Sequence, residues 1–363
     1  MGKRVIHFAV PGAIGRKTGG YGYDRRIIDG LRNRGRDVRV HELEGRFPCP
    51  DDTAVTAAAD LIASTPDGDA LIIDGLALPA FESGLEPASQ RRCIIALVHH
   101  LLCDETSLDA ADRRSLGAIE TRCLGAARRV IVTSPATEIS VWGVGFPRDL
   151  ISVVTPGTDP VSAAIIPDRP DRDLSGPLRL LSVGSVIPRK GHRTLIHALA
   201  VSRAHDWRLT IVGSLSVDSP TTADIRALIG RENLADSIHL MGELDHARLQ
   251  AEYRRADIFV LASEFEGYGM AFAEAMAHGL PIVGSGGGAV ADTVPEDCGL
   301  LAPVGDAAAL SDALDRVMTD APFRRRLAAG AARAGRRLPS WDAAAAEFDA
   351  ALESAFRALP VTA

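Results

Sequence analysis

The sequence feature that most constrains the fold is a short apolar run, Ala256 to Ser263 (ADIFVLAS), which is followed by a glycine-bearing loop. A run of this length with polar flanks predicts a strand that is buried on both faces of a parallel sheet. A helix is expected next, from about Met270 to His278, and Gly279 and Pro281 end it. A strand that enters a helix through a tight loop is the building unit of α/β folds.

The same alternation of strands and helices covers most of the chain and favours two α/β domains. One series begins with the strand Arg4 to Val10, and a second restarts at Leu178 to Val183. The intervening segment, Pro156 to Gly176, is rich in proline, glycine and charge, which is typical of a linker. With 363 residues, 46% of them hydrophobic, each half can bury a core. We therefore predict an N-terminal domain over residues 1–165, a second domain over 166–340 and a C-terminal helix over 341–363.

Composition argues against several other classes of protein. The net charge is −7 and no basic run is longer than Arg324 to Arg326, so no nucleic-acid footprint is visible. Val5 to Val10 is too short for a signal-peptide core, and no stretch of 18 apolar residues suggests a membrane span. The five cysteines lack metal-ligand spacing and are odd in number, as expected of reduced thiols. A cytoplasmic protein is predicted, with peripheral membrane contact left open.

Two carboxylates, Glu266 and Glu274, flank the junction between the predicted strand and helix. Gly267 and Gly269 let the backbone approach a ligand closely, and the unpaired N–H groups at the helix start favour an anion. Glu274, one turn into the helix, can accept both hydroxyl protons of a ribose, while Glu266 lies in the loop beside the sugar or phosphates. The alternative is a solvated glutamate pair on an ordinary strand, loop and helix.

The segment EGYGMAFAEAMAHGLPIV, which starts at Glu266, resembles the Glu-x7-Glu signature of retaining glycosyltransferases of family 4. The resemblance implies the α/β fold called GT-B, in which two Rossmann-like, doubly wound domains face a central cleft and the C-terminal helix crosses back to the N-terminal domain. It also implies that the second domain binds a nucleotide sugar, with the ribose on Glu274. The donor sugar and phosphates would then meet the loop residues Glu266, Gly267, Tyr268, Gly269 and Met270.

A second signal lies in the loop Gly184 to Gly191, because lysine occurs in this chain only at positions 3, 17 and 190. The compact ammonium of Lys190 can neutralise a diphosphate in a narrow space. The resembled family carries Gly-Arg…Lys-Gly in this loop, with Arg and Lys clamping the donor diphosphate. Ser185 stands where that Arg is expected, so either Arg189 replaces it or the clamp is incomplete. The alternative is a surface turn with an ordinary Arg-Lys pair.

The loop Gly12 to Gly22, between the first strand and the first helix, is the third candidate. Gly19 and Gly20 can lay backbone N–H groups against a phosphate at the carboxyl edge of the sheet. The loop lacks the ordered G-x-G-x-x-G of dinucleotide binders, which argues against a nicotinamide cofactor. In the resembled family a Gly-Gly loop here approaches the donor phosphate, so the side chains nearby become acceptor-side candidates: Lys17, Tyr21 and Tyr23.

His99 and His100 end the predicted strand Cys93 to Val98, where a histidine is either structural or directed at a ligand. The resemblance implies that His99 touches the donor sugar, with His100 as the second candidate and Glu105 on the acceptor side. Gly213 follows the predicted strand Leu209 to Val212, Met241 ends the predicted strand Ser237 to Met241, and both are expected to border the base.

Asp67-Gly68-Asp69 formally fits the Asp-x-Asp of metal-dependent glycosyltransferases, but it precedes a strand as a Pro-Asp-Gly turn. The fold that the resemblance implies needs no metal, so no metal and no other cofactor is expected. The resemblance therefore implies a metal-independent, retaining glycosyltransferase, most simply a hexosyltransferase, that uses a nucleoside-diphosphate-sugar and a small-molecule, lipid-linked or glycan hydroxyl acceptor. Two alternatives are another GT-B activity, such as an epimerase or phosphorylase, and a non-catalytic sugar-nucleotide-binding subunit. The base, sugar, acceptor, linkage and oligomeric state stay open.

Overall fold

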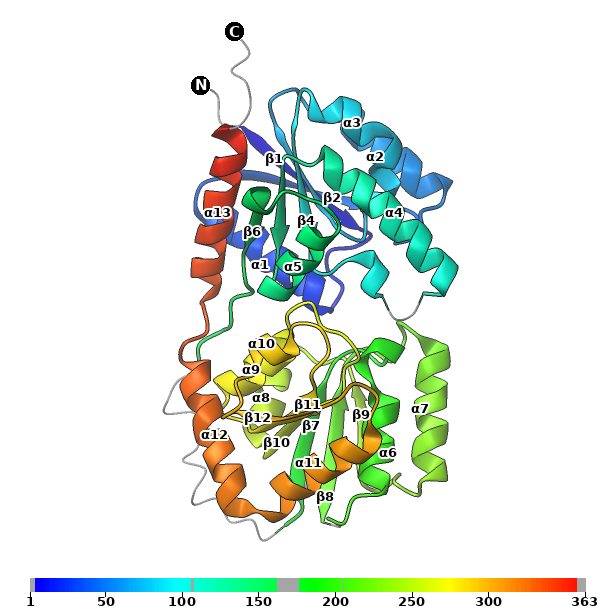
Figure 1. The fold of residues 1–363 in the computed structure, drawn as a ribbon, viewed down its shortest axis with the longest axis vertical. Coiled ribbons are helices and arrows are strands. Elements are labelled where there is room, and N and C mark those ends of the chain that lie inside the picture. The colour runs from blue at the N-terminus through cyan, green and yellow to red at the C-terminus, as the bar shows by residue number, and fades with distance from the viewer. Residues whose placement is uncertain (1–3, 106–107, 162–175, 205, 358–363) are drawn as a thin grey trace. The chain divides into compact units, whose positions relative to one another are not determined.

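The computed structural model describes residues 4–105, 108–161, 176–204 and 206–357, and they fold into two compact units. Unit 1 comprises Met1–Gly157 together with Pro339–Ala363, and unit 2 comprises Thr158–Leu338. Each unit has a six-stranded parallel sheet between helices (Figure 1). The domain boundary predicted between residues 165 and 166 lies outside the described residues, and the chain passes from unit 1 to unit 2 after Gly157.

The sheet of unit 1 has the strand order β2-β1-β3-β4-β5-β6. Because β1 pairs with both β2 and β3, the winding of the chain reverses between β1 and β3. The strands are β1 (Val5–Pro11), β2 (Asp37–Leu43), β3 (Ala70–Asp74), β4 (Cys93–Val98), β5 (Arg129–Val132) and β6 (Ile151–Val153). The helices are α1 (Gly19–Asn33), α2 (Asp52–Ser64), α3 (Glu82–Ser89), α4 (Ala110–Ala126), α5 (Pro135–Gly143) and α13 (Trp341–Arg357), with 3₁₀ turns at η1 (Leu78–Phe81), η2 (Leu102–Asp104) and η3 (Arg148–Leu150).

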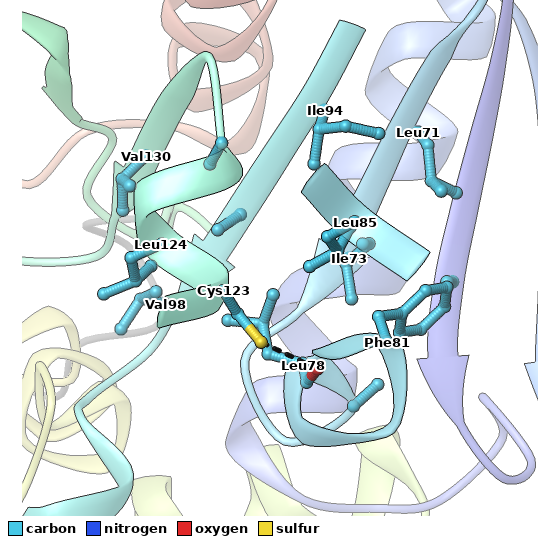
Figure 2. Packing of buried hydrophobic residues seen from close by; sticks show 14 of the residues in the cluster. Leu71, Ile73, Leu78, Phe81, Leu85, Ile94, Val98, Cys123, Leu124 and Val130 are labelled. Carbon is cyan, nitrogen blue, oxygen red and sulfur yellow. Dashed lines mark hydrogen bonds between the residues drawn. The ribbon is translucent and has the colours of Figure 1, made fainter. Parts of the chain in front are cut away.

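Alternate strand residues of unit 1 enter opposite faces of its sheet, as the two-residue period requires. Ile73 of β3 and Ile94 of β4 pack with Phe81, Leu85 and Leu124 under the helices of one face (Figure 2). Their neighbours along the strands are equally buried but lie outside this cluster. Both faces of the sheet are therefore covered, which explains the continuous apolar runs of the sequence.

Helix α13 belongs to unit 1 although it ends the described chain. It packs closely on α1, since a Cβ placed on Gly30 would lie 2.4 Å from the Cβ of Ala345. Arg36 anchors the same contact through Asp349 and Glu353, each at 2.6 Å. The predicted return of the C-terminal helix to the N-terminal domain is confirmed.

Unit 2 repeats the architecture with the strand order β12-β11-β10-β7-β8-β9. Its strands are β7 (Leu178–Val183), β8 (Trp207–Val212), β9 (Ile238–Gly242), β10 (Ile258–Leu261), β11 (Ile282–Ser285) and β12 (Gly299–Ala302). Its helices are α6 (His192–Ala200), α7 (Ser219–Arg231), α8 (His246–Arg255), α9 (Met270–Ala277), α10 (Val290–Thr293), α11 (Ala307–Thr319) and α12 (Ala321–Gly335), with a 3₁₀ turn at η5 (Pro188–Lys190). One apolar cluster includes residues of α6, α7 and α11, and another includes residues of α8, α9 and α10. Helices therefore cover both faces of the sheet of unit 2. Throughout the described ranges, no helix is long and apolar enough to cross a membrane.

Candidate functional site

The winding of unit 2 reverses between β7 and β10, and open α/β sheets have their ligand crevice at the carboxyl edge beside such a reversal. From β7 the chain winds outward through β8 and β9 on one side, and through β10, β11 and β12 on the other. The loops after β7 and β10 therefore leave the sheet side by side and part in opposite directions, which is where open α/β sheets bind ligands. The two loops are joined by a hydrogen bond of 2.8 Å from the Glu264 N–H to the Arg189 carbonyl.

These loops bring Lys190 and Glu266 into a buried ion pair. The Lys190 Nζ lies 2.6 Å from Oε1 of Glu266, and the Ser263 hydroxyl donates to the same oxygen at 2.6 Å. Arg189 stands on the other side, 3.8 Å from Oε2, and donates to the Phe265 carbonyl at 2.8 Å. Burial by itself would raise the pKa of Glu266, but the charges of Lys190 and Arg189 and the two hydrogen bonds outweigh it and lower the pKa below its ordinary value.

The two helices that begin in this crevice lack side-chain caps. In unit 2, α7, α8, α11 and α12 each begin behind an aspartate that accepts a backbone N–H: Asp218, Asp245, Asp306 and Asp320. Helices α6 and α9 begin instead at Gly191 and Gly269, both with left-handed backbone angles. Their first N–H groups and positive dipole ends are thus left to a ligand, and both suit an anion.

Glu274 lies one turn into α9 and is oriented by Tyr253 of α8. The Tyr253 hydroxyl donates to Oε2 of Glu274 at 2.8 Å. Burial first, and then the adjacent Glu274 charge, raise the pKa of Tyr253 well above its ordinary value, so the hydroxyl keeps its proton. Glu274 is half-buried, whereas Glu266 is buried. The two carboxylates therefore differ: Glu266 holds a lysine, and Glu274 accepts from a hydroxyl.

The remaining donor-side residues predicted from the sequence lie in the same loops or on the β8–β9 side. Ser185 is the second residue of the loop that carries Lys190, and Gly267 and Tyr268 connect Glu266 to α9, which starts at Met270. The Gly213 N–H, after β8, donates to the Gly242 carbonyl at 3.0 Å, next to Met241, whose side chain is exposed. A Cβ placed on Gly213 would lie 2.1 Å from the Gly184 carbonyl oxygen, so Gly213 lies beside the loop after β7, while Met241 lies in β9, one strand farther out.

Unit 1 presents a second cluster where its own winding reverses. A Cβ placed on Gly20, at the start of α1, would lie 3.4 Å from the His99 ring, so the predicted glycine and histidine meet. The Nε2 of His99 lies 3.2 Å from Asp24 and 3.3 Å from Asp74. Gly19 is the first residue of α1, immediately before Gly20.

The other site residues predicted in unit 1 are mostly buried or paired within the protein, which makes them less suited to contact a substrate. The Tyr23 side chain is fully buried, and its hydroxyl donates to the Val154 carbonyl at 3.0 Å. The prediction that Tyr23 contacts the acceptor substrate is therefore wrong. Its position in the 3.6-residue period of α1 directs the side chain into the core. Tyr21 is also largely buried and donates to the Pro11 carbonyl. His100 pairs with Glu105 at 2.7 Å, while Lys17 is exposed in the loop before α1.

The Asp-x-Asp segment is a turn, as predicted. Asp67 and Gly68 form a turn before β3, at the amino edge of the sheet, and Asp69 accepts from the Val5 N–H at 3.0 Å. Asp24, Asp74 and His99 offer nitrogen and oxygen atoms within 4.8 Å of one another. Since Nε2 of His99 is already shared by both carboxylates, we assign no metal to this trio.

Four residues of these clusters are absent from the sequence predictions: Ser263, Tyr253, Asp24 and Asp74. Asp74 ends β3 and Ser263 follows β10, so both carry the signal of a polar residue at a carboxyl strand end. Asp24 and Tyr253 lie within helices and carry no such signal, because a helical pattern does not reveal which neighbour a side chain meets.

Residues 168–334 match the family model described as "Glycosyl transferases group 1". The D-inositol 3-phosphate glycosyltransferase of Xylanimonas cellulosilytica is 32% identical over 214 residues, which are 56% of this chain and 51% of that relative. The chain spans about half the length of the curated relatives that it matches.

Two solved structures show the same fold. Sucrose-phosphate synthase from Thermosynechococcus elongatus matches with a TM-score of 0.81 at 24% identity, over 98% of this chain and 100% of that one. HepE of Anabaena, solved in complex with UDP and glucose, matches with a TM-score of 0.76 at 18% identity, over 97% and 100%. The predicted α/β GT-B fold is confirmed, and the similarity to group 1 glycosyl transferases covers residues 168–334.

Proposed function

We propose that this protein transfers a sugar from a nucleoside-diphosphate-sugar to a hydroxyl acceptor, retaining the anomeric configuration and requiring no metal. The observation that carries the proposal is the Lys190–Glu266 ion pair, which lies between the uncapped starts of α6 and α9. All of these residues belong to the segment 168–334 that matches the group 1 family model. A lysine and two helix starts converging on one crevice fit a diphosphate better than any neutral ligand. Unit 2 would hold the nucleotide, and unit 1 would supply groups for the acceptor.

In the proposed reaction the bond between the anomeric carbon and the diphosphate oxygen breaks, and the acceptor oxygen bonds to that carbon on the same face. The leaving diphosphate takes the proton of the acceptor hydroxyl. Negative charge grows on the diphosphate, where Lys190 and the amides that start α6 and α9 stabilise it. Glu266 keeps the Lys190 ammonium in place before the donor binds. This arrangement supplies the positive charge that a divalent ion provides in Asp-x-Asp enzymes.

The relatives support a nucleotide-sugar donor. HepE, which shares the fold, has been solved with UDP and glucose, and the relative from Xylanimonas is named as a glycosyltransferase. Arg189 strengthens the case that the chain is catalytic although Ser185 replaces the expected arginine. Its guanidinium reaches the same Glu266 as Lys190, so two cations bracket the crevice.

The proposal is tested by identifying the donor and then following the reaction. Thermal shifts with UDP, GDP, ADP and their sugars identify the donor, since a ligand at 100 times its Kd adds about 2.7 kcal/mol of stability. A proton NMR time course with a panel of hydroxyl acceptors then follows turnover. We expect transfer that survives EDTA and a product with the anomeric configuration of the donor. Inversion, or loss of transfer on chelation with recovery on Mg²⁺ or Mn²⁺, would contradict the proposal.

Glu274→Gln is expected to weaken nucleotide binding about tenfold or more, because a charged acceptor for the ribose hydroxyls becomes a weaker neutral one. The variant keeps the size of the side chain, and its amide oxygen still accepts from Tyr253, so the melting temperature should change little. Calorimetric titration of the best nucleotide measures the effect. Glu296→Gln, at an exposed position of unit 2, is the matched control. Equal affinity of the two variants would remove Glu274 from the site.

A further inference from the structure

His99 is held by two carboxylates that come from two other elements of unit 1. It follows β4, whereas Asp24 lies in α1 and Asp74 ends β3. The His99 Nε2 is 3.2 Å from Oδ1 of Asp24 and 3.3 Å from Oδ2 of Asp74. Asp74 is itself fixed, because its Oδ1 accepts from the Leu76 N–H at 2.8 Å. One ring nitrogen thus faces two acceptors, which requires that it carry a proton.

Other contacts hold the backbone and the ring of His99 and leave one side of the ring open. The hydroxyls of Thr133 and Thr137 donate to the His99 carbonyl at 3.2 and 3.3 Å, and the Tyr23 ring meets the imidazole edge-on at 5.4 Å. Gly20 lies against the Nε2 side of the ring. The side chain is 18% exposed. Among the described residues none hydrogen-bonds Nδ1, so this nitrogen remains for a ligand.

We propose that Asp24 and Asp74 are positioning residues that hold His99 as an imidazolium, with Nε2 turned inward and Nδ1–H presented to a hydroxyl oxygen of the substrate. This inference rests on the proposed function, and it assigns His99 the role of a fixed charged donor. A ring with both nitrogens protonated accepts no proton from the acceptor hydroxyl, so His99 is not the base. The cluster holds two carboxylates for one cation, and an anionic substrate group is therefore not the partner of Nδ1.

The electrostatics of the cluster agree with this geometry. Burial would lower the pKa of His99, but the hydrogen bonds and charges of Asp24 and Asp74 outweigh it and raise the pKa to about 10. Burial raises the pKa of Asp24 to about 6, against the lowering effect of His99. Two tyrosines also lie near the cluster, Tyr21 and Tyr23, and burial raises the pKa of both, so they stay neutral. Up to about pH 9, His99 therefore keeps its charge.

The first test measures the protonation of His99 directly and needs no turnover. The protein labelled with ¹⁵N-histidine is titrated from pH 5.5 to 9, and the His99 signals are identified by their loss in His99→Gln. We expect both ring nitrogens to remain protonated over the whole range, whereas an ordinary histidine titrates near pH 6.5. A neutral His99 ring at pH 7.5 overturns the proposal, whatever the activity of the protein.

The second test uses the pH dependence of turnover in Asp24→Asn and Asp74→Asn. Removing one carboxylate lowers the pKa of His99, so the neutral ring accumulates as the pH rises. We expect turnover of both variants to fall at least tenfold relative to the unsubstituted protein at pH 8.5, and to recover largely at pH 6. Asp29→Asn, at an exposed position of α1, is the control and should follow the unsubstituted profile.

An equal loss at every pH in both variants would indicate a structural role only and would also overturn the proposal. If the unsubstituted protein transfers no sugar, the proposed function fails, and the NMR titration alone decides the state of His99. The two failures are therefore distinguishable.

Discussion

Replacing Lys190 with alanine is expected to lower turnover by about 10²–10³-fold, the usual effect of removing one group that stabilises transition-state charge. The same change leaves the buried Glu266 carboxylate without its 2.6 Å partner, which should cost about 3 kcal/mol of stability. Turnover and unfolding must therefore be separated. Initial rates at saturating donor and urea unfolding midpoints measure the two effects.

The double variant Lys190→Ala/Glu266→Gln separates the effect on turnover from the effect on stability. A neutral glutamine no longer needs a cation and still accepts from the Ser263 hydroxyl, so stability should recover. Turnover should not recover, because the charge that stabilises the diphosphate is still missing. Arg193→Ala, an exposed cation in the first turn of α6, is the control and should keep full activity. Full turnover in Lys190→Ala would transfer the proposed role to Arg189.

Replacing Gly191 with alanine is expected to disrupt the loop that carries Lys190. Gly191 has a φ of +63°, and a Cβ placed there would lie 1.8 Å from the Ala262 carbonyl oxygen, just after β10. The left-handed backbone and the clash act together, so the free energy of unfolding should fall by about 2–4 kcal/mol. Because the loop must move away from β10, nucleotide binding should be lost under conditions where the variant is still folded.

Gly230→Ala is the matched control for this prediction. Gly230 lies in α7, and an added Cβ would meet no atom within 4 Å. Alanine in an exposed helix should stabilise the protein by about 0.5–1 kcal/mol and leave binding unchanged. Nucleotide affinity and unfolding midpoints of both variants give the comparison. A Gly191→Ala protein with normal affinity would show that the close approach of the two loops is unnecessary.

Local patterns in the sequence were sufficient for most of the fold. The strand predicted at Leu178–Val183 has those bounds in the structure, and the helix expected at Met270 to His278 spans Met270–Ala277. Such elements are predictable because buried parallel strands are continuous apolar runs, and because glycine and proline end helices. The sequence after Gly288 gave weaker signals of secondary structure, and β12, α11 and α12 were not predicted.

The sequence pattern was enough to predict the alternating α/β architecture, Lys190 and Glu266 in loops and Glu274 in the helix that follows, while the return of the last helix was implied by the resemblance to family 4. Which side chains meet depends on how the strands and helices pack. Lys190 and Glu266 are 76 positions apart and form a pair because β7 and β10 are neighbours in the sheet. Asp24 reaches His99, 75 positions away, by the same kind of strand order. Periodicity reports which face of an element is buried, whereas sheet order depends on the packing of the whole unit, and that order brings the charged groups together.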